Sequence, residues 1–465
     1  MSAQTISKID PIQINIFLRN TPVSQMGFGL PMILGIKAPT YFLQILSGSA
    51  GLIWKSVTPG IVFIQVKYIV SGNNTALSVV RSGTGTENDP FVITVNVATN
   101  GTGVATSTAH QVKLAAEAVS NIAGATKIVD VIEVANVGSG VVSAFTQAAL
   151  SYERYMEITS ADDLLELGFL STDKEYIQAT KVFRQTPRPK TVAIFLLTAW
   201  ANAATEIASL RNTGKDAWFK AIATTHVKSE IYVLGDYLAS IEKMFLPAQT
   251  IQRFLLEVNS IWEYITLHKN PDSFPEAAWV GNTAPRKVGS YNYAYLPLDS
   301  VENSGYTNSQ TSSIFSDNGN LIVDFGGRQV PYPGISTGKV YADVVENRVW
   351  LKARLRENIT SLFLNSDVVP YTIQGIQMIE ARMREVFAQA GRQGIIAPVE
   401  TEADKARSDL GDYQYKINLP ETIDEIPTND RNNRILPNIT FSCRLRGAIN
   451  EVDIDGRINL RRIQE

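Results

Sequence analysis

The side chains that most often perform catalysis are few in this chain and lie far apart in its sequence. The histidines are His110, His226 and His268, and none belongs to an HExxH motif, which would place two imidazoles on one helix face. Because a metal site needs several ligands that converge, this spacing predicts none. The single cysteine, Cys443, has no histidine near it in sequence and is expected to be a small buried apolar side chain. We therefore expect no catalytic residue, no metal and no cofactor.

Two short motifs resemble those of β-lactamase-like acyl enzymes. Ser171 and Lys174 form an SxxK motif, and Ser316, Asp317 and Asn318 form an SDN motif. The third motif of those enzymes, KTG, is absent from the sequence. Ser171 also lies in a polar stretch typical of a helix-capping turn. Chance therefore explains the two motifs better than an acyl-transfer function does.

The sequence also lacks a loop that could cradle phosphate groups. No GxGxxG opens a predicted helix, no GxxxxGK[ST] occurs, and Gly326-Gly327 is typical of a turn. The carboxylate pairs Asp162-Asp163 and Asp343-Glu346 are of a kind that can perform acid–base chemistry. Acidic residues also favour the first turn of a helix, so solvated helix starts are the simpler interpretation of both pairs.

Charge and composition exclude several classes of partner. The 42 Lys and Arg residues nearly balance the 45 Asp and Glu residues, and the formal net charge is −3. Binding to nucleic acid or to an anionic membrane would need a basic excess or a basic cluster, and the sequence has neither. The N-terminus lacks the pattern of a signal peptide, and the most apolar early stretch, 27–36, is interrupted by Gly29 and Pro31. We expect a soluble protein that is kept in the cytoplasm until it is assembled.

A chain of 465 residues is longer than one hydrophobic core usually supports, so two or more domains are expected. The predicted fold class is α/β: a layered α/β core domain, an inserted small β-rich domain, and extended strand arms at both ends. The predicted boundaries are 1–20 for the N-terminal arm, 21–56 and 148–430 for the core, 57–147 for the inserted domain, and 431–465 for the C-terminal arm.

These domains are predicted from local patterns. In the inserted domain, short β-branched runs are separated by clusters of Gly, Asn, Ser and Thr, with one helix expected at Thr108–Asn121. In the core, helices and strands alternate, and the continuous apolar run Thr191–Leu197 is typical of a strand buried on both faces. Two amphipathic helices follow, whose apolar stripes are Leu351, Leu355, Ile359 and Leu362, and Ile376, Ile379, Met383, Val386 and Ala390.

Both ends of the chain have the period-two pattern of a strand with one buried face. One alternating run lies between Pro11 and Pro22. The other begins at Phe441, is broken at Gly447 and contains an Asp455-Gly456 turn. Because a lone strand in water is at best marginally stable, each end needs a partner from elsewhere.

Several stretches form a series along most of the chain. They are Gln25–Gly29, Pro31–Gly35, Glu175–Pro189, Phe274–Gly281, Trp350–Leu364, Pro370–Ile376, Gly394–Ala397, Arg434–Pro437 and Arg446–Ile449. In this order they resemble the contractile tail sheath proteins of phages with myovirus-like tails. No single stretch is specific, and their shared order carries the resemblance.

The resemblance implies a structural subunit and no enzyme. Such a subunit would stack as six-membered rings around a tail tube and contract to drive that tube through the host envelope. Its partners would be further copies of itself, the tail tube protein, and baseplate and tail terminator proteins. The protein would belong to the tail of the virion and be assembled in the host cytoplasm. The inserted β-rich domain resembles domains that sheath proteins carry outward on the core.

Three alternatives remain open on the sequence. The same subunit could form the sheath of a phage-tail-like bacteriocin or of another contractile injection particle. A tail-tube or baseplate protein is a second alternative, although tube proteins are usually smaller and mostly β. An α/β enzyme with flexible termini is the third, and it predicts a deep pocket with titratable groups of perturbed pKa.

The two terminal patterns suggest how a sheath subunit would polymerise. An exposed strand recruits other chains through its unpaired N–H and C=O groups, and addition to a neighbour's sheet would make this recruitment the function. Contraction would be a rigid-body rotation of the core, with hinges at Pro22, Gly27, Gly29 and Gly447. The residues predicted to make strand contacts between subunits are Ile12, Ile14, Ile16, Leu18, Phe441, Leu445, Ile449, Val452, Ile454 and Ile458.

Overall fold

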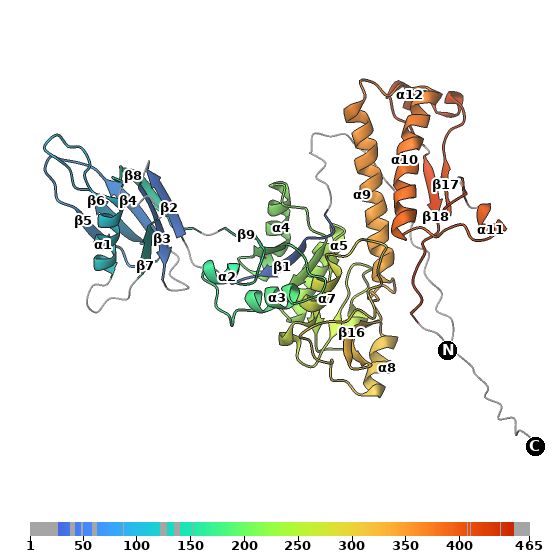
Figure 1. Cartoon of the computed structure of the whole chain (residues 1–465), viewed down its shortest axis with the longest axis horizontal. Coiled ribbons are helices and arrows are strands. Elements are labelled where there is room, and N and C mark those ends of the chain that lie inside the picture. The colour runs from blue at the N-terminus through green and yellow to red at the C-terminus, as the bar shows by residue number, and fades with distance from the viewer. Residues whose placement is uncertain are drawn as a thin grey trace, which may run out of the picture. The chain divides into compact units, whose positions relative to one another are not determined.

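The computed structural model describes most of the chain, which divides into two compact units (Figure 1). We call residues 36–176 the inserted unit and residues 1–35 with 177–465 the main unit. The expected α/β class is confirmed, since parallel and antiparallel sheets occur together with helices. The described residues are 27–37, 42–47, 50–57, 63–86, 88–120, 128–133, 140–151, 153–406, 408–409, 411–437 and 439–450.

The main unit is built on parallel strands in the order β12-β11-β1-β10. In the central strand, β1 (Pro31–Gly35), Ile33 pairs with Ile194 on one side and with Ile222 on the other. Every residue of β1, β10 and β11 is buried, which explains the continuous apolar runs of β1 and β10 and confirms the strand expected at Thr191–Leu197. The other strands are β10 (Val192–Leu196), β11 (Lys220–Ala223) and β12 (Met244–Phe245).

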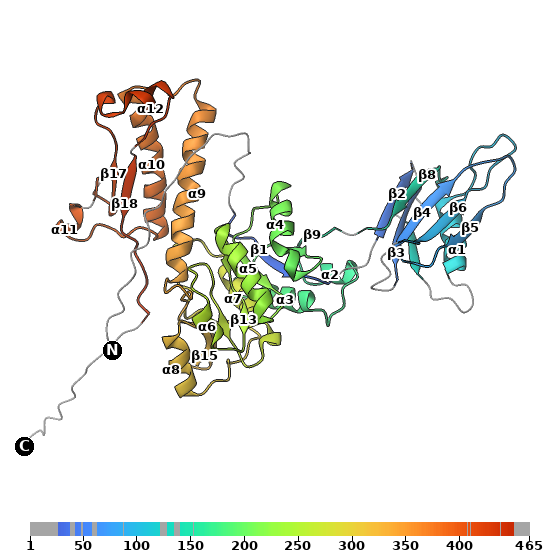
Figure 2. The ribbon, with the colours of Figure 1, turned by 180° about the vertical axis from the view of Figure 1, so that it is seen from behind.

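Helices lie on both sides of this sheet. Figures 1 and 2 show α4 above β1, and α3 and α7 below it. Gly281 of α7 allows close approach to α3, because a Cβ at this position would lie 2.5 Å from the carbonyl oxygen of Val182. These helices are α3 (Lys174–Phe183), η1 (Trp200–Asn202), α4 (Ala203–Asn212), α5 (Lys228–Ser240), α6 (Phe254–Glu257), η2 (Pro271–Ser273) and α7 (Pro275–Thr283).

Two smaller strand pairs complete this part of the main unit. β13 (Ala248–Gln249) and β14 (Thr266–Leu267) are parallel. After α8 (Asn308–Ser316), β15 (Leu321–Phe325) and β16 (Arg328–Tyr332) form an antiparallel hairpin. The expected turn at Gly326-Gly327 is confirmed, with positive φ at both glycines.

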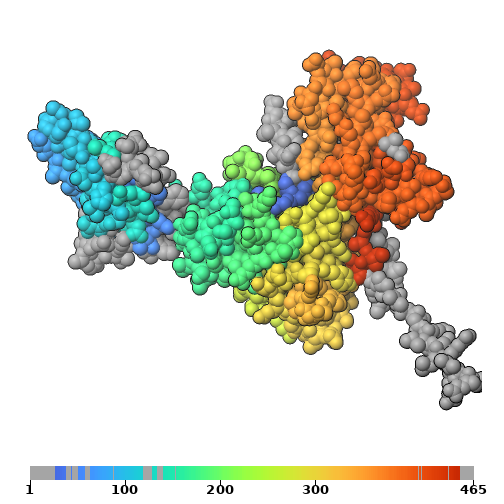
Figure 3. All heavy atoms as spheres, viewed as in Figure 1, coloured from blue at the N-terminus to red at the C-terminus, as the bar shows by residue number. Residues whose placement is uncertain are grey.

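The C-terminal part of the main unit begins with two long helices. α9 (Ala342–Asn365) and α10 (Ile373–Gln393) lie side by side, as Figures 1 and 2 show, and confirm the two amphipathic helices. The turn that follows α10 is made by Gly394, whose φ is 88°. Shorter elements follow: α11 (Glu402–Lys405), β17 (Tyr415–Asn418), η3 (Ile423–Glu425), α12 (Thr428–Asn432) and β18 (Thr440–Cys443). Figure 3 shows the atoms of α9, α10 and the following elements gathered in one lobe of the main unit.

A buried polar cluster joins α9 to the parallel sheet. Lys220 Nζ of β11 lies 2.6 Å from Glu346 Oε1 of α9, and both side chains are almost fully buried. Tyr291 Oη donates to Glu346 Oε2 (2.6 Å). Burial, together with the Glu346 carboxylate, holds the pKa of Tyr291 well above its usual range, so its hydroxyl keeps the proton that it donates. α9 is therefore attached to the sheet by specific polar contacts as well as by apolar packing.

The inserted unit contains two sheets and one long helix. β3 lies between β2 and β7 in an antiparallel sheet, and the second sheet has the order β5-β6-β4-β8. Trp54 Nε1 of β3 donates to Tyr68 Oη of β4 (2.8 Å), which links the two sheets through a buried hydrogen bond. The elements are β2 (Phe42–Ser47), β3 (Ala50–Ser56), β4 (Ile64–Ile69), β5 (Ser78–Ser82), β6 (Phe91–Asn96), α1 (Ala109–Ser120), β7 (Val129–Glu133), β8 (Phe145–Ala149), β9 (Tyr155–Ile158) and α2 (Asp163–Glu166).

The boundaries of the inserted unit differ from the expected 57–147. Contacts place it at 36–176, because β2 pairs with β3, β3 pairs with β7, and the three strands share one apolar core. The sequence of β2 and β3, which lie before residue 57, does not indicate locally which sheet these strands join. Within the described residues, no helix combines the length and the apolar character that a membrane span requires.

Candidate functional site

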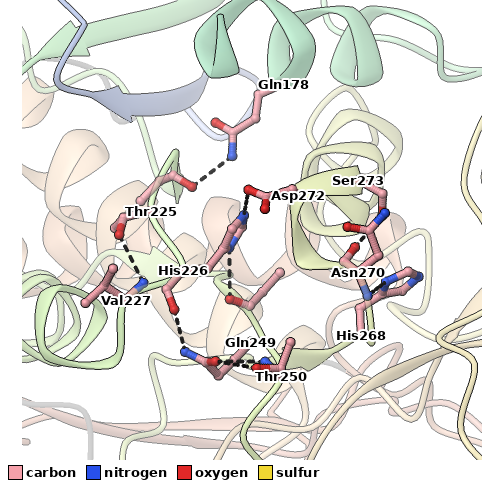
Figure 4. Close-up of polar contacts among 12 residues, drawn as sticks. Gln178, Thr225, His226, Val227, Gln249, Thr250, His268, Asn270, Asp272 and Ser273 are labelled. Atoms are coloured by element: carbon pink, nitrogen blue, oxygen red, sulfur yellow. Dashed lines mark hydrogen bonds and ion pairs between the residues drawn. The ribbon is translucent and has the colours of Figure 1, made fainter. Parts of the chain in front are cut away.

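The three histidines make separate contacts and do not converge. His110 Nδ1 lies 2.8 Å from Glu133 Oε1 at the surface of the inserted unit. His226, directly after β11, contacts Ala248 O through Nδ1 (3.2 Å) and lies 3.7 Å from Asp272 through Nε2. Figure 4 shows these contacts together with those of His268, whose Nδ1 accepts from the Asn270 amide (3.0 Å).

The contacts around His226 connect loops and contain no catalytic arrangement. The His226 carbonyl accepts from Gln249 Nε2 (2.9 Å), and Thr225 Oγ1 accepts from the Val227 amide (3.1 Å). The network thus ties the segment after β11 to β13 (Figure 4). Among the residues that the structure describes, no group of three or more His, Cys, Asp or Glu side chains could hold a metal ion.

The motifs that resemble acyl enzymes are separated. Ser171 and Lys174 belong to the inserted unit, whereas the SDN triplet belongs to the main unit. Ser316 Oγ donates to Ser312 O (3.0 Å) within α8, and Asp317 follows that helix as its C-cap. Burial raises the pKa of Cys443 to about 11, so its thiol is protonated and is no nucleophile at neutral pH.

A different kind of site lies beside α10: a sheet in which the described residues form two strands. β17 and β18 are antiparallel, with Ile417 opposite Phe441 and Tyr415 opposite Cys443. Figures 1 and 2 show both strands on the side of α10 that faces away from α9. Two-stranded sheets are marginal by themselves, so this one depends on packing against the rest of the main unit.

One face of the β17–β18 sheet packs on α10. The ring of Phe387 lies 4.8 Å from that of Tyr415 and 5.1 Å from that of Phe441, between centroids. The inward positions are buried or partly buried, and the alternate positions are exposed: Lys416, Asn418, Thr440 and Ser442. A strand with alternating apolar residues would therefore continue this face if it were added to either edge.

Among the residues that the structure describes, the outer edge of β18 has no backbone partner. The Arg444 amide donates to Gln414 O (3.0 Å), so Arg444 directs its N–H toward the chain that continues as β17. Because the backbone groups of successive residues in a strand point to alternate sides, Ser442 also directs its backbone groups toward β17, while Phe441 and Cys443 direct theirs away from it. Among the described residues, no backbone group pairs with this outward edge.

The outer edge of β17 is occupied by Asp409. The Ile417 amide donates to Asp409 Oδ2 (2.8 Å), and the Asp409 amide donates to Tyr415 O (3.1 Å). The Asp409 side chain is 19% exposed, and Arg384 Nη2 lies 4.0 Å from its Oδ2. The two edges of the sheet therefore differ, since β18 is open and β17 is capped.

The chain after β18 remains bound to the main unit as far as Asn450. The Arg446 amide donates to Ile395 O (3.0 Å), and Leu445 forms an antiparallel bridge with Ile396. Tyr295 Oη donates to Asn450 O (2.6 Å), and the side chain of Asn292 donates to Asn450 Oδ1. The expected C-terminal arm from residue 431 is therefore shorter in the structure, because residues 440–450 make their contacts within the chain.

The predicted contact residues fall into two groups. Phe441 lies on β18 and Leu445 forms an isolated bridge with Ile396, so both are paired inside their own chain, which differs from the donated strand that the alternating pattern suggested. Ile449 is 83% exposed. Ile12, Ile14, Ile16, Leu18, Val452, Ile454 and Ile458 lie outside the described residues, as does the expected hinge Pro22.

The described hinge candidates have different surroundings. A Cβ at Gly27 would lie 2.8 Å from Ala217 O, so close packing by itself requires glycine there. A Cβ at Gly29 would lie 3.6 Å from Ala284 O, which is an ordinary van der Waals contact. Gly447 has a φ of 67° and no neighbour within 4 Å, which is the most open of the three. The hinge roles stay predictions.

Sequence reasoning missed β17 and Asp409. The stretch Tyr415–Asn418 does alternate, but four residues are too short a run to identify a strand. Asp409 has no sequence signal at all, because its role depends on where the fold places β17.

Comparison with known proteins connects this region to one family. Residues 342–458 match the family described as "E217 tail sheath protein gp31-like, C-terminal domain". The matched segment contains α9, α10 and both strands of the β17–β18 sheet. No curated protein sequence matches the chain significantly.

Solved structures of contractile particles resemble the chain weakly. A chain of the anti-feeding prophage baseplate has 11% identity and a TM-score of 0.49, over 98% of this chain and 100% of that chain. A chain of the PVC sheath complex in the contracted state, from an extracellular contractile injection system, has 11% identity and a TM-score of 0.49, over 67% and 88%. The sheath tail protein Lin1278 from Listeria innocua has 8% identity and a TM-score of 0.38, over 86% and 90%. Because these scores are low, the match of residues 342–458 is the comparison that bears on function.

Proposed function

We propose that this chain, whose residues 342–458 match the family of tail sheath C-terminal domains, is a structural subunit of a contractile sheath. The observation that carries its mechanism is the open outer edge of β18. That edge belongs to a sheet with two strands in the described part of the chain, and the inner face of this sheet is already packed on α10. Such an edge is a template for a strand from another chain.

A terminal segment of a neighbouring copy is the strand that fits this edge. The run that contains Ile12, Ile14, Ile16 and Leu18 has the alternation that the α10 side of the sheet requires. Added beside β18, its apolar side chains would extend the row that Phe441 begins. A strand of about seven residues spans ~23 Å, enough to bridge adjacent subunits. Phe441 and Leu445 then contribute to contacts between subunits as part of the accepting edge.

Strand exchange of this kind leads to a helical polymer. Each copy donates a strand to one neighbour and accepts a strand from another neighbour at a different surface. The contact is therefore heterologous and generates rings or helices. We infer stacked hexameric rings around a tail tube, with tube, baseplate and terminator proteins as the other partners. Contraction is then a rigid-body rotation of the subunits. The strands that link neighbouring subunits stay paired during this rotation, and the chain bends at the hinges Gly27, Gly29 and Gly447. The assembled protein belongs to a phage tail or a related contractile particle and is made in the host cytoplasm.

No catalytic step is part of this function. The histidine contacts in Figure 4 tie loops together, and the serine motifs belong to different units. Work is obtained from new interfaces formed on contraction, so no nucleotide or other cofactor is needed.

The test is polymerisation of the purified full-length chain, followed by light scattering and negative-stain microscopy. Striated cylinders are expected from the full chain, and folded monomers from chains that lack residues 1–20 or 451–465. The second truncation ends at Asn450 so that β18 and its pairing with β17 stay intact. Circular dichroism confirms that each truncated chain is folded. Cylinders from both truncated chains would contradict strand exchange, and no cylinders from the full chain would contradict the sheath function.

A further inference from the structure

Four aromatic rings gather on the surface of the main unit, around the β15–β16 hairpin. The ring of Tyr332 lies 5.3 Å from that of Tyr295, 5.2 Å from that of Phe315 and 6.2 Å from that of Phe325, between centroids. Tyr295 is 41% exposed and Phe325 is 50% exposed. Single apolar side chains are ordinary on a protein surface, whereas a contiguous group of rings is typical of a binding surface. We call these four residues the aromatic cluster.

Backbone pairing holds the aromatic cluster in place. β15 pairs with β16 along its whole length, and the Tyr295 amide donates to Pro331 O beside the hairpin (3.0 Å). Phe315 belongs to α8, which Figures 1 and 2 show next to the hairpin. Because these elements fix the rings before any partner arrives, little conformational entropy is lost when a partner binds them.

Two hydrogen bonds lead the C-terminal segment of the chain to the aromatic cluster. Tyr295 Oη donates to Asn450 O (2.6 Å), and the side chain of Asn292 donates to Asn450 Oδ1. Residues 451–465 follow Asn450 in the sequence. Since Asn450 is bonded to a member of the cluster, the residues directly after it have a high effective concentration at the rings.

The first residues of this segment have side chains that suit an aromatic surface. Val452 and Ile454 alternate with acidic residues, so an extended chain is aliphatic on one side and acidic on the other. At ~3.3 Å per residue, these two side chains come roughly 7 Å and 13 Å along the chain from Asn450. The ring centroids of Tyr295 and Phe325 are 5.5 Å apart, so both exposed rings are within reach.

We infer, resting on the proposed function, that the aromatic cluster is the docking site of residues 452–454 of its own chain in the free subunit. This contact keeps the C-terminal segment from neighbouring copies until one of them captures it. Capture then exchanges a contact within one chain for a contact between two chains. Because two aliphatic side chains on partly exposed rings bind weakly, docking slows the first steps of assembly and does not prevent them.

Methyl NMR of free subunits, at concentrations below those that give cylinders, tests the docking. A methyl group that lies over an aromatic ring resonates upfield, and the synthetic peptide 451–465 gives the undocked positions of Val452 and Ile454. The wild type is compared with full-length Phe325→Ser. Phe363→Ser is the matched control, because it removes the same ring from a position on α9 that is 38% exposed. Circular dichroism confirms that each chain is folded, and the lag time of assembly is measured at higher concentration.

The expected result depends on the aromatic cluster alone. In the wild type and in Phe363→Ser, the methyl groups of both aliphatic residues resonate upfield of the peptide. Phe325→Ser loses this shift and assembles after a shorter lag than the wild type. Tyr295→Phe keeps the ring but removes the donor to Asn450 O, so its upfield shift is smaller than that of the wild type.

Three outcomes overturn the inference. If the wild type has the methyl positions of the peptide, or if the upfield shift survives in Phe325→Ser, the cluster does not bind this segment. If the shift fades on dilution, the segment comes from a second copy. If Phe325→Ser loses the shift but keeps the wild-type lag, docking does not restrain assembly. The NMR outcomes concern free subunits and leave the proposed function intact, whereas a wild type that forms no cylinders contradicts that function and leaves the docking itself standing.

Discussion

Lys220 and Glu346 form an ion pair with an Nζ–Oε1 distance of 2.6 Å, and it lies between the parallel sheet and the first long helix of the sheath-related segment. Both side chains are almost fully buried, and Tyr291 also donates to Glu346. A charge pair in this position orients α9 on the sheet, because any other placement of the helix would leave one charge buried without its partner.

Breaking this pair is expected to destabilise the main unit strongly. Glu346→Gln leaves the Lys220 ammonium buried without an anion, which should lower the free energy of unfolding by about 3–5 kcal/mol. The measurement is chemical denaturation followed by tryptophan fluorescence. Lys352→Met is the control. Lys352, also on α9, pairs with Glu242, and the side chains of both residues are more than one third exposed. The loss of this pair should cost about 1 kcal/mol or less. Equal losses in the two variants would contradict a special role for the buried pair.

Glu263 is expected to make the stability of the main unit depend on pH. Burial raises the pKa of its carboxyl to about 8, Asp236 adds to the shift, and Gly235 of α5 packs directly against the carboxyl group. Among the described residues, Glu263 Oε2 has no hydrogen-bond partner. The unfolded chain releases this proton near pH 4.5 and the folded chain only near pH 8, so stability falls as pH rises between these values.

Thermal melts across this pH range test the Glu263 prediction. Glu263→Gln should remove a decline of up to about 1.4 kcal/mol per pH unit and leave the stability at low pH nearly unchanged. Glu257→Gln, at a partly exposed side chain, is the control and should keep the decline. A wild-type curve that is flat between pH 5 and 8 would show that the carboxyl is ionised in the fold.

Proline substitutions distinguish the two sides of β18. Cys443→Pro removes an N–H that points to the open edge, whereas Ser442→Pro removes one that points to β17. Proline is tolerated on an edge strand only where its missing N–H faces outward. We expect Cys443→Pro to remain folded but to form no cylinders, and Ser442→Pro to lower the melting temperature of the subunit. Cylinders from a folded Cys443→Pro variant would rule out strand addition at this edge.

The inserted unit should respond to mutation separately from polymerisation. Tyr68→Phe leaves the buried Trp54 N–H without its acceptor, which should cost about 1–3 kcal/mol. The double variant Trp54→Phe with Tyr68→Phe removes both polar groups and should recover part of this loss. Cylinders are expected from both variants at temperatures where the inserted unit is folded. Loss of assembly by Tyr68→Phe under those conditions would show that the unit contributes to the contacts between subunits.

The sequence by itself determined the elements with strong periodic patterns. The run at Thr191–Leu197 is a buried strand, and the stripes that begin at Leu351 and Ile376 lie on two long helices. These patterns arise because one residue type repeats at the spacing of the element, so each is visible within a short window. The order of weak motifs also indicated the sheath family before any contact was known.

Only the tertiary structure decided which surfaces are open. The pairing of β18 with β17, the cap that Asp409 places on β17 and the Lys220–Glu346 pair join residues between 6 and 126 positions apart. The same is true of β3, which joins the inserted unit through pairing with β7 and brings with it β2, its partner on the other side. An alternating pattern predicts that one face of a strand will be buried. The same pattern occurs in a strand that is donated to another chain and in a strand that pairs with a donated one. That distinction depends on where the backbone N–H and C=O groups point after the chain has folded, and no local pattern of side chains records it.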